Sequence, residues 1–165
     1  MIEHVAIPDE RIKKLKHGKG WETEIGKFLE VNIELREDVV IEGDDVFQVL
    51  RAKEIFKAYG RGFDFLDCLD LLDDDYVLSV MEMKDFVGKP RDRVTTMKGR
   101  VIGEGGSVKR QIEKAANVKV CVYGKTISVI GKAENTRIAE EAIAMILFGS
   151  KHNKVYRFLS EHKVV

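Results

Sequence analysis

The fold is decided by the stretch Lys98-Gly99-Arg100-Val101-Ile102-Gly103-Glu104-Gly105-Gly106-Ser107-Val108-Lys109-Arg110. Three of four consecutive central positions are glycine, and each glycine inside a helix would cost about 1 kcal/mol relative to alanine. On both sides of the glycines, apolar residues recur at the spacing of one helical face. The stretch therefore predicts two short helices joined by a tight glycine turn.

The predicted turn is surrounded by positive charge. A helix that begins directly after a glycine turn presents unpaired backbone N–H groups, which suit an anion. A P-loop is excluded because no Lys-Ser or Lys-Thr pair follows the glycines. A dinucleotide fingerprint is excluded because a helix, and not a strand, precedes them. The flanking cations are Lys98, Arg100, Lys109 and Arg110.

The order of elements around the turn is regular. Residues 75–83, 118–122 and 126–130 alternate between apolar and polar side chains, as half-buried strands do. Two longer segments, 133–148 and 151–162, have helical periodicity. The second half of the chain therefore predicts strand, helix, glycine turn, helix, two strands, a long helix and a last helix.

The first half repeats this order. Residues 3–7, 31–35 and 39–41 are expected strands, and Ile25, Phe28 and Leu29 are expected to face inward on a helix. Lys16-His17-Gly18-Lys19-Gly20 matches Ile102–Gly106 at an offset of 86. A repeat of this length indicates two copies of one domain, 1–75 and 76–165. An amphipathic helix, 62–72, is expected between them.

Composition narrows the class of protein. The net charge is zero, but residues 1–86 carry 12 Lys and Arg against 21 Asp and Glu, while residues 87–165 carry 16 against 7. This division predicts that phosphate is attracted to the second half, and a solvated surface is the alternative. Two isolated cysteines fit a reducing cytoplasm. No metal-ligand spacing, cofactor motif or nucleophile–base pair stands out, so we expect no metal, no cofactor and no enzyme.

A helix–GxxG–helix unit followed by two strands and a long helix resembles the KH domain. That resemblance implies an α+β protein of two tandem type I KH domains, each with three helices on one face of a three-stranded sheet. The added segments are an inter-domain helix and a C-terminal helix. In KH domains the GxxG loop holds the backbone of about four nucleotides of single-stranded RNA.

The resemblance assigns the RNA site to the second copy. Its residues are expected to act as loop, charge or groove lining, and Val101 could instead belong to the core. Glu104 departs from the basic residue that many KH domains carry there, which weakens phosphate attraction. The assigned RNA-binding residues are Lys98, Arg100, Val101, Ile102, Gly103, Glu104, Gly105, Gly106, Lys109, Arg110, Val118 and Val120.

The first copy has a degenerate loop, because His17 stands where the leading glycine belongs. The segment is nevertheless basic, and Trp21 either stacks on a base or packs against its own helix. A secondary RNA contact is therefore one alternative, and a structural turn is the other. Its residues are Lys13, Lys16, His17, Gly18, Lys19, Gly20 and Trp21.

Two further segments narrow the resemblance. Val122-Tyr123-Gly124-Lys125-Thr126 and Val155-Tyr156-Arg157-Phe158-Leu159 look like the archaeal KH-domain ribosomal-RNA processing family, which is related to the eukaryotic partner of the Nob-one endonuclease. The resemblance implies small-subunit rRNA maturation and ribosome biogenesis near the 16S rRNA 3′ end. Partners would be the nuclease and the alpha subunit of translation initiation factor two. The alternative is a scaffold that docks these proteins without direct RNA contact.

Overall fold

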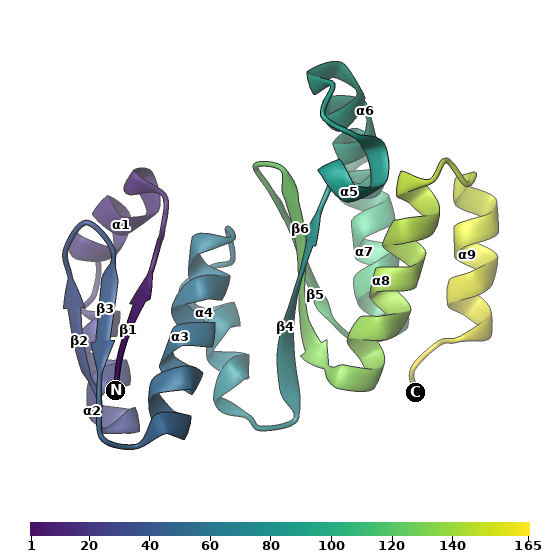
Figure 1. Cartoon of the computed structure of the whole chain (residues 1–165). Helices are drawn as coiled ribbons and strands as arrows, with labels where there is room; N and C mark the ends of the chain where they lie inside the picture. The colour runs from purple at the N-terminus through teal and green to yellow at the C-terminus, as the bar shows by residue number, and fades with distance from the viewer. The chain divides into compact units, whose positions relative to one another are not determined.

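The computed structural model describes residues 1–165 and divides into two compact units, Met1–Asp73 and Asp74–Val165 (Figure 1). The expected α+β class is confirmed, because each unit contains one three-stranded antiparallel sheet covered by helices.

The first unit follows the predicted order. In its sheet, β3 is the central strand and pairs antiparallel with both β1 and β2. Its elements are β1 (Ile2–Val5), α1 (Asp9–Lys16), α2 (Trp21–Leu29), β2 (Asn32–Leu35), β3 (Val39–Glu42), α3 (Val46–Gly60), α4 (Phe65–Cys68) and the 3-10 turn η1 (Leu69–Leu72).

The second unit has the same topology, with β6 as the central strand. Figure 1 shows α7 and α8 on one side of its sheet, followed by α9. Its elements are β4 (Tyr76–Glu82), α5 (Lys84–Val87), α6 (Arg91–Ile102), the 3-10 turn η2 (Glu104–Gly106), α7 (Ser107–Ala116), β5 (Lys119–Tyr123), β6 (Thr126–Lys132), α8 (Ala133–Leu147) and α9 (His152–Glu161).

The core of the second unit lies between its sheet and its helices. Strand side chains that point to the helical face meet the apolar stripes of α6, α7 and α8, and α9 adds Val155 and Leu159. The fully buried members include Val101, Ile112, Ile127, Val129, Ile143 and Ile146. This packing fixes the two helices that flank the glycine turn.

Two local expectations need correction. The single helix expected at 62–72 begins only at Phe65, because Gly62 has a φ of 103° and leaves the helical region. It then tightens into the 3-10 turn η1 after Cys68. Phe28, expected to face inward, is 71% exposed. The short helix α5 was not expected at all, because four residues are too few to show a helical period.

No helix combines the length and apolar character that crossing a membrane requires. No group of three or more His, Cys, Asp or Glu side chains is placed to hold a metal ion.

Candidate nucleic-acid interface

The glycine turn in the second unit has a backbone that only glycine adopts readily. Gly103, Gly105 and Gly106 have φ values of 75°, 60° and 80°, all in the left-handed region. The N–H of Gly106 donates to the carbonyl of Gly103 at 3.1 Å, which closes the turn. The turn ends at Gly106, the N-cap of α7.

The space around the three glycines differs. A Cβ on Gly103 would lie 2.4 Å from Cγ2 of Val108, whereas a Cβ on Gly105 would meet no atom within 4 Å. Gly103 is therefore required by packing, and Gly105 is open to solvent. An exposed loop without side chains lets a phosphate approach the backbone and the first turn of α7 closely.

The cations expected around this loop divide into two groups. Lys98 and Lys109 are half-buried and Arg110 is exposed. The guanidinium of Arg110 donates to the carbonyl of Gly105 at 2.6 Å, so it braces the loop from the side of α7. Lys98 and Lys109 belong to α6 and α7, the helices that flank the turn, and Arg110 contacts the turn itself, so all three are candidates to neutralise phosphate charge there.

Arg100 has a different place from the one expected. Its guanidinium donates to the carbonyl of Ser150 at 2.6 Å and to that of Ile146 at 3.3 Å. Its own carbonyl contacts Nε2 of His152 at 3.0 Å. Ile146 lies in the last turn of α8 and Ser150 in the segment that follows it, so the guanidinium lies at the C-terminal end of α8, where a cation interacts favourably with the helix dipole. Arg100 therefore joins α6 to α8 and α9 and does not present its charge at the loop.

The three valines expected to line the groove are all buried, and their contact with RNA stays a prediction. Val101 is fully buried, which settles its two alternatives in favour of the core. Val118 and Val120 are 7% and 3% exposed and belong to the same core. Val120 in β5 and Val118, just before it, are two positions apart and so share one face, and this face packs in the core with the helices. Ile102 is half-buried and lies directly before the turn, and Glu104 is exposed at its tip.

Glu113 is a residue that sequence patterns did not indicate. Its Oε2 accepts a hydrogen bond from the N–H of Val120 at 3.1 Å. Because β5 is an edge strand, this N–H has no partner strand, and the carboxylate ties α7 to β5 instead. A lone glutamate on a helix carries no sequence signal for such a contact. Glu113 thus fixes the distance between the two sides of any groove beside the loop.

The degenerate loop of the first unit has another backbone conformation. His17 has a φ of −92°, in contrast to the 75° of Gly103, and so needs no glycine. Gly20 retains the left-handed conformation of Gly106, with a φ of 76°. Lys13, Lys16, Lys19 and His17 are all exposed. The positive charges of this loop are therefore exposed to solvent, although its backbone conformation differs from that of the Gly103–Gly106 loop.

Trp21 has a partner within the first unit. Its ring stacks on Phe65 with 5.1 Å between centroids and 14° between planes. Of the two alternatives for Trp21, packing is therefore realised, although with Phe65 of α4 and not with its own helix. The stack and Gly18 both border a cavity in the first unit.

Together, the topology and the glycine loop define a nucleic-acid-binding domain of the KH class. Residues 77–164 match the family model of the eukaryotic-type KH domain (KH-domain type I). The chain belongs to this KH family.

The relatives point to one branch of that family. A KH domain-containing protein of Methanocaldococcus jannaschii is 37% identical over 98% of this chain and 74% of its own length. The pre-rRNA-processing protein pno1 of Schizosaccharomyces pombe is 31% identical over 76% of this chain. The match covers 52% of that fungal protein, so this chain corresponds to about half of it.

A solved structure is similar over nearly the whole chain. It is the crystal structure of the a/eIF2alpha–aDim2p–rRNA complex from Pyrococcus horikoshii. The matched chain is 32% identical with a TM-score of 0.89, and the match covers 98% of this chain and 93% of that one. The likeness includes both units, so the resemblance expected from the sequence is confirmed.

Proposed function

We propose that this protein binds single-stranded RNA at the Gly103–Gly106 loop and acts in small-subunit ribosomal RNA maturation near the 16S rRNA 3′ end. The observation that carries the proposal is the loop itself, with three left-handed glycines and an exposed, unobstructed Gly105 before the first turn of α7. This loop is the part of a KH domain that holds an RNA backbone.

The relatives support the ribosomal part of the proposal. Their names include pre-rRNA processing, and one similar chain was crystallised in a complex with rRNA and the alpha subunit of the initiation factor. We extend both to this chain, with the initiation factor subunit and a Nob-one-type endonuclease as protein partners in the cytoplasm. The protein would act by binding and positioning RNA and not by catalysis.

The charges give the proposal its expected salt dependence. Lys98, Lys109 and Arg110 lie beside the loop and would displace counterions from two to three phosphates. At about −0.7 per phosphate on a single strand, the slope of log affinity against log salt is about −1.4 to −2.1. Arg100 is left out because its guanidinium is bound at Ile146 and Ser150, whereas that of Arg110 is bound within the loop, at Gly105.

A competition experiment tests the proposal. Fluorescence anisotropy of a labelled strand from the 16S rRNA 3′ end would be measured against an unrelated strand of equal length and against a duplex. We expect the 3′-end strand to compete best and the duplex worst, because a KH groove takes unstacked bases. Equal competition by the unrelated strand would remove the ribosomal assignment. Equal competition by the duplex would contradict the groove mechanism.

The same anisotropy measurement distinguishes the proposed function from the alternative, a scaffold without direct RNA contact. The acidic balance of the first unit, with 11 Lys and Arg against 17 Asp and Glu in residues 1–73, favours a basic docking partner. A scaffold would show no saturable binding of any strand at low salt, whereas the proposed function requires it.

A further inference from the structure

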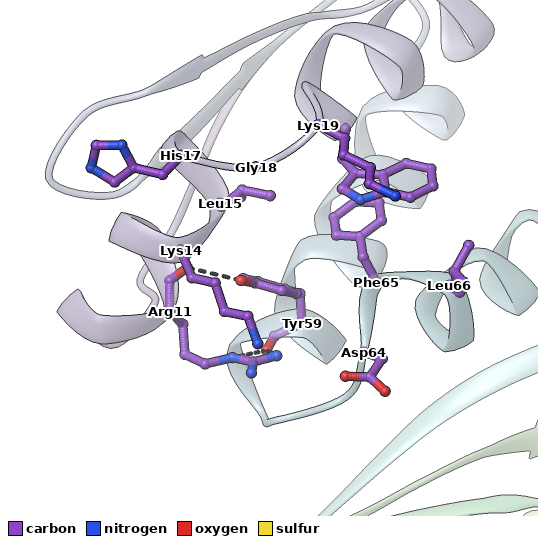
Figure 2. A pocket seen from close by; sticks show the side chains of 11 residues that line it. Arg11, Lys14, Leu15, His17, Gly18, Lys19, Tyr59, Asp64, Phe65 and Leu66 are labelled. Atoms are coloured by element: carbon purple, nitrogen blue, oxygen red, sulfur yellow. Dashed lines mark hydrogen bonds between the residues drawn. The ribbon is translucent and has the colours of Figure 1, made fainter.

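The first unit contains a cavity of about 510 Å³, which is separate from the proposed RNA site at the Gly103–Gly106 loop of the second unit (Figure 2). It lies where the loop after α1 meets the segment that leads into α4. Its lining combines lysines, an aromatic wall and one carboxylate, represented by Lys14, Lys19, Trp21, Phe65 and Asp64. A cavity of this size is in the range that small ligands occupy, about 300–1,000 Å³.

Positive charge is concentrated at this cavity. Residues 11–19 hold five Lys and Arg and no carboxylate, while residues 1–73 as a whole hold 11 Lys and Arg against 17 Asp and Glu. Lys14 and Lys19 are exposed, and neither makes a salt bridge. An acidic unit with one basic segment beside its cavity attracts an anion to that place.

The walls of the cavity are held by structural bonds. Arg11 donates to the carbonyls of Tyr59 and Phe63 at 2.9 and 2.6 Å, and its guanidinium lies 4.1 Å from the centroid of the Tyr59 ring. The Tyr59 hydroxyl donates to the carbonyl of Arg11 at 2.9 Å. Burial raises the pKa of Tyr59, with Arg11 acting in the opposite direction, so the hydroxyl keeps its proton and this bond. Arg11 is thus part of the wall.

The aromatic side of the cavity is also fixed. Phe65 is stacked on Trp21, makes an edge contact with Phe56 and lies tilted against Tyr59, with 5.5 and 5.6 Å between the centroids of the last two pairs. Leu66 next to it is 66% exposed. A flat apolar ring that enters the cavity therefore meets a wall that needs no rearrangement, which lowers the entropic cost of binding.

The carboxylate of Asp64 favours a nucleotide over an acidic peptide as the ligand of this cavity. It occupies the N-cap position of α4, yet its side chain accepts no capping hydrogen bond, and it is exposed at the cavity. A carboxylate repels phosphates and peptide carboxylates alike, but it accepts hydrogen bonds from the exocyclic amino group of a base, which the side chains of an acidic peptide lack. Lysines, an aromatic wall and an acceptor together match the phosphate, ring and amino group of one nucleotide.

The first unit has a second hollow that can be compared with this cavity as a place for RNA. It lies between α2 and β2, the position that corresponds to α7 and β5 in the second unit, and its ionisable side chains are Glu22, Glu30 and Lys27. Two carboxylates against one lysine disfavour RNA there. The basic cavity beside α1 is therefore the better place for RNA on this unit.

We propose that the cavity bordered by Lys14, Lys19, Phe65 and Asp64 binds one nucleotide of single-stranded RNA, with cytosine or adenine preferred over uracil. The inference rests on the proposed RNA-binding function and adds a second contact that does not use a GxxG loop. Lys14 and Lys19 neutralise the phosphate, the aromatic wall contacts the base, and Asp64 accepts from its amino group.

The chain offers a local reporter for this site, because Trp21 is its only tryptophan. The fluorescence of Trp21 would be followed while the full-length protein is titrated with the trinucleotide CpCpC, and separately with UpUpU. We expect a saturable change with CpCpC and weaker binding of UpUpU. Lys14→Gln and Lys19→Gln should each weaken binding of CpCpC about threefold, in the range of one exposed charge contact. Asp64→Asn should reduce the preference for CpCpC.

Lys27→Gln is the matched control, since it removes one exposed charge from the same unit at the other hollow. It should leave the Trp21 titration unchanged. No saturable change at Trp21, while anisotropy still reports RNA binding that Gly105→Asp abolishes, would overturn the cavity proposal and leave the proposed function standing. Loss of both signals would overturn the proposed function as well. A response to an acidic tetrapeptide, with none to CpCpC, would make the cavity a protein-binding site and overturn its assignment to RNA.

Discussion

A negative charge at Gly105 should abolish most RNA binding without disturbing the fold. Gly105 has a φ of 60° and a ψ of 21°, and its Cβ position is open. Aspartate and asparagine are the residues that tolerate this left-handed conformation best. Gly105→Asp and Gly105→Asn therefore differ in charge but hardly in shape, and both should lower the free energy of unfolding by a similar amount, about 1 kcal/mol, because the left-handed backbone strains any L-residue.

The magnitude follows from Coulomb's law. A carboxylate about 4 Å from a phosphate is repelled by about 1 kcal/mol in a water-like medium and by about 4 kcal/mol near a protein surface. We take a value near the lower end because the loop is exposed, and expect at least a tenfold loss for Gly105→Asp, which is about 1.4 kcal/mol. Gly105→Asn should lose clearly less, since it adds bulk alone.

The assay is anisotropy of a labelled single strand at low salt, with denaturant unfolding to compare the variants' stability. Unchanged affinity in a folded Gly105→Asp variant would remove this loop from the RNA site. Equal losses for the two substitutions would show that bulk, and not charge, blocks the strand, and would refute the electrostatic reasoning.

Three further variants test how the loop is held. Gly103→Ala should lower the free energy of unfolding by at least about 2 kcal/mol, because its φ and ψ of 75° and 170° suit only glycine and Val108 leaves no room for a Cβ; thermal stability unchanged would contradict this. Arg100→Ala should cost about 1.5–3 kcal/mol in denaturant unfolding through the lost bonds to α8, and an effect on RNA affinity alone would show that its charge serves the RNA after all. Glu113→Ala should cost about 1–3 kcal/mol because it leaves the Val120 N–H without its partner, with faster amide exchange at Val120 as the direct measurement and wild-type exchange as the contrary result.

The positions of the secondary-structure elements were largely readable from local patterns. The alternation in residues 118–122 and the helical spacing on either side of Gly103–Gly106 are patterns among neighbouring residues. They therefore predict a strand and two helices without any information on tertiary contacts. The glycine turn is equally local, because the left-handed conformation at three positions is a property of the residue type. The internal repeat then gave two copies of one fold, even though its first loop is degenerate.

The roles of single side chains depended on residues far away in the chain. Arg100 has the sequence context of a phosphate-binding cation, yet carbonyls 46 and 50 residues later bind its guanidinium. Val118 and Val120 are buried because the face that they share, along and just before β5, meets the helices, and alternation alone does not say which face that is.

The first-unit cavity shows the same division between sequence and structure. The sequence determined that residues 11–19 are basic and that a tryptophan follows them. Only the tertiary structure placed Phe65 against Trp21 and Asp64 at the rim, because these residues lie more than 40 positions away and meet through the packing of α3 and α4. Local spacing fixes the type and the face of an element. A binding site also needs the distances between elements, and those are set by packing of the core.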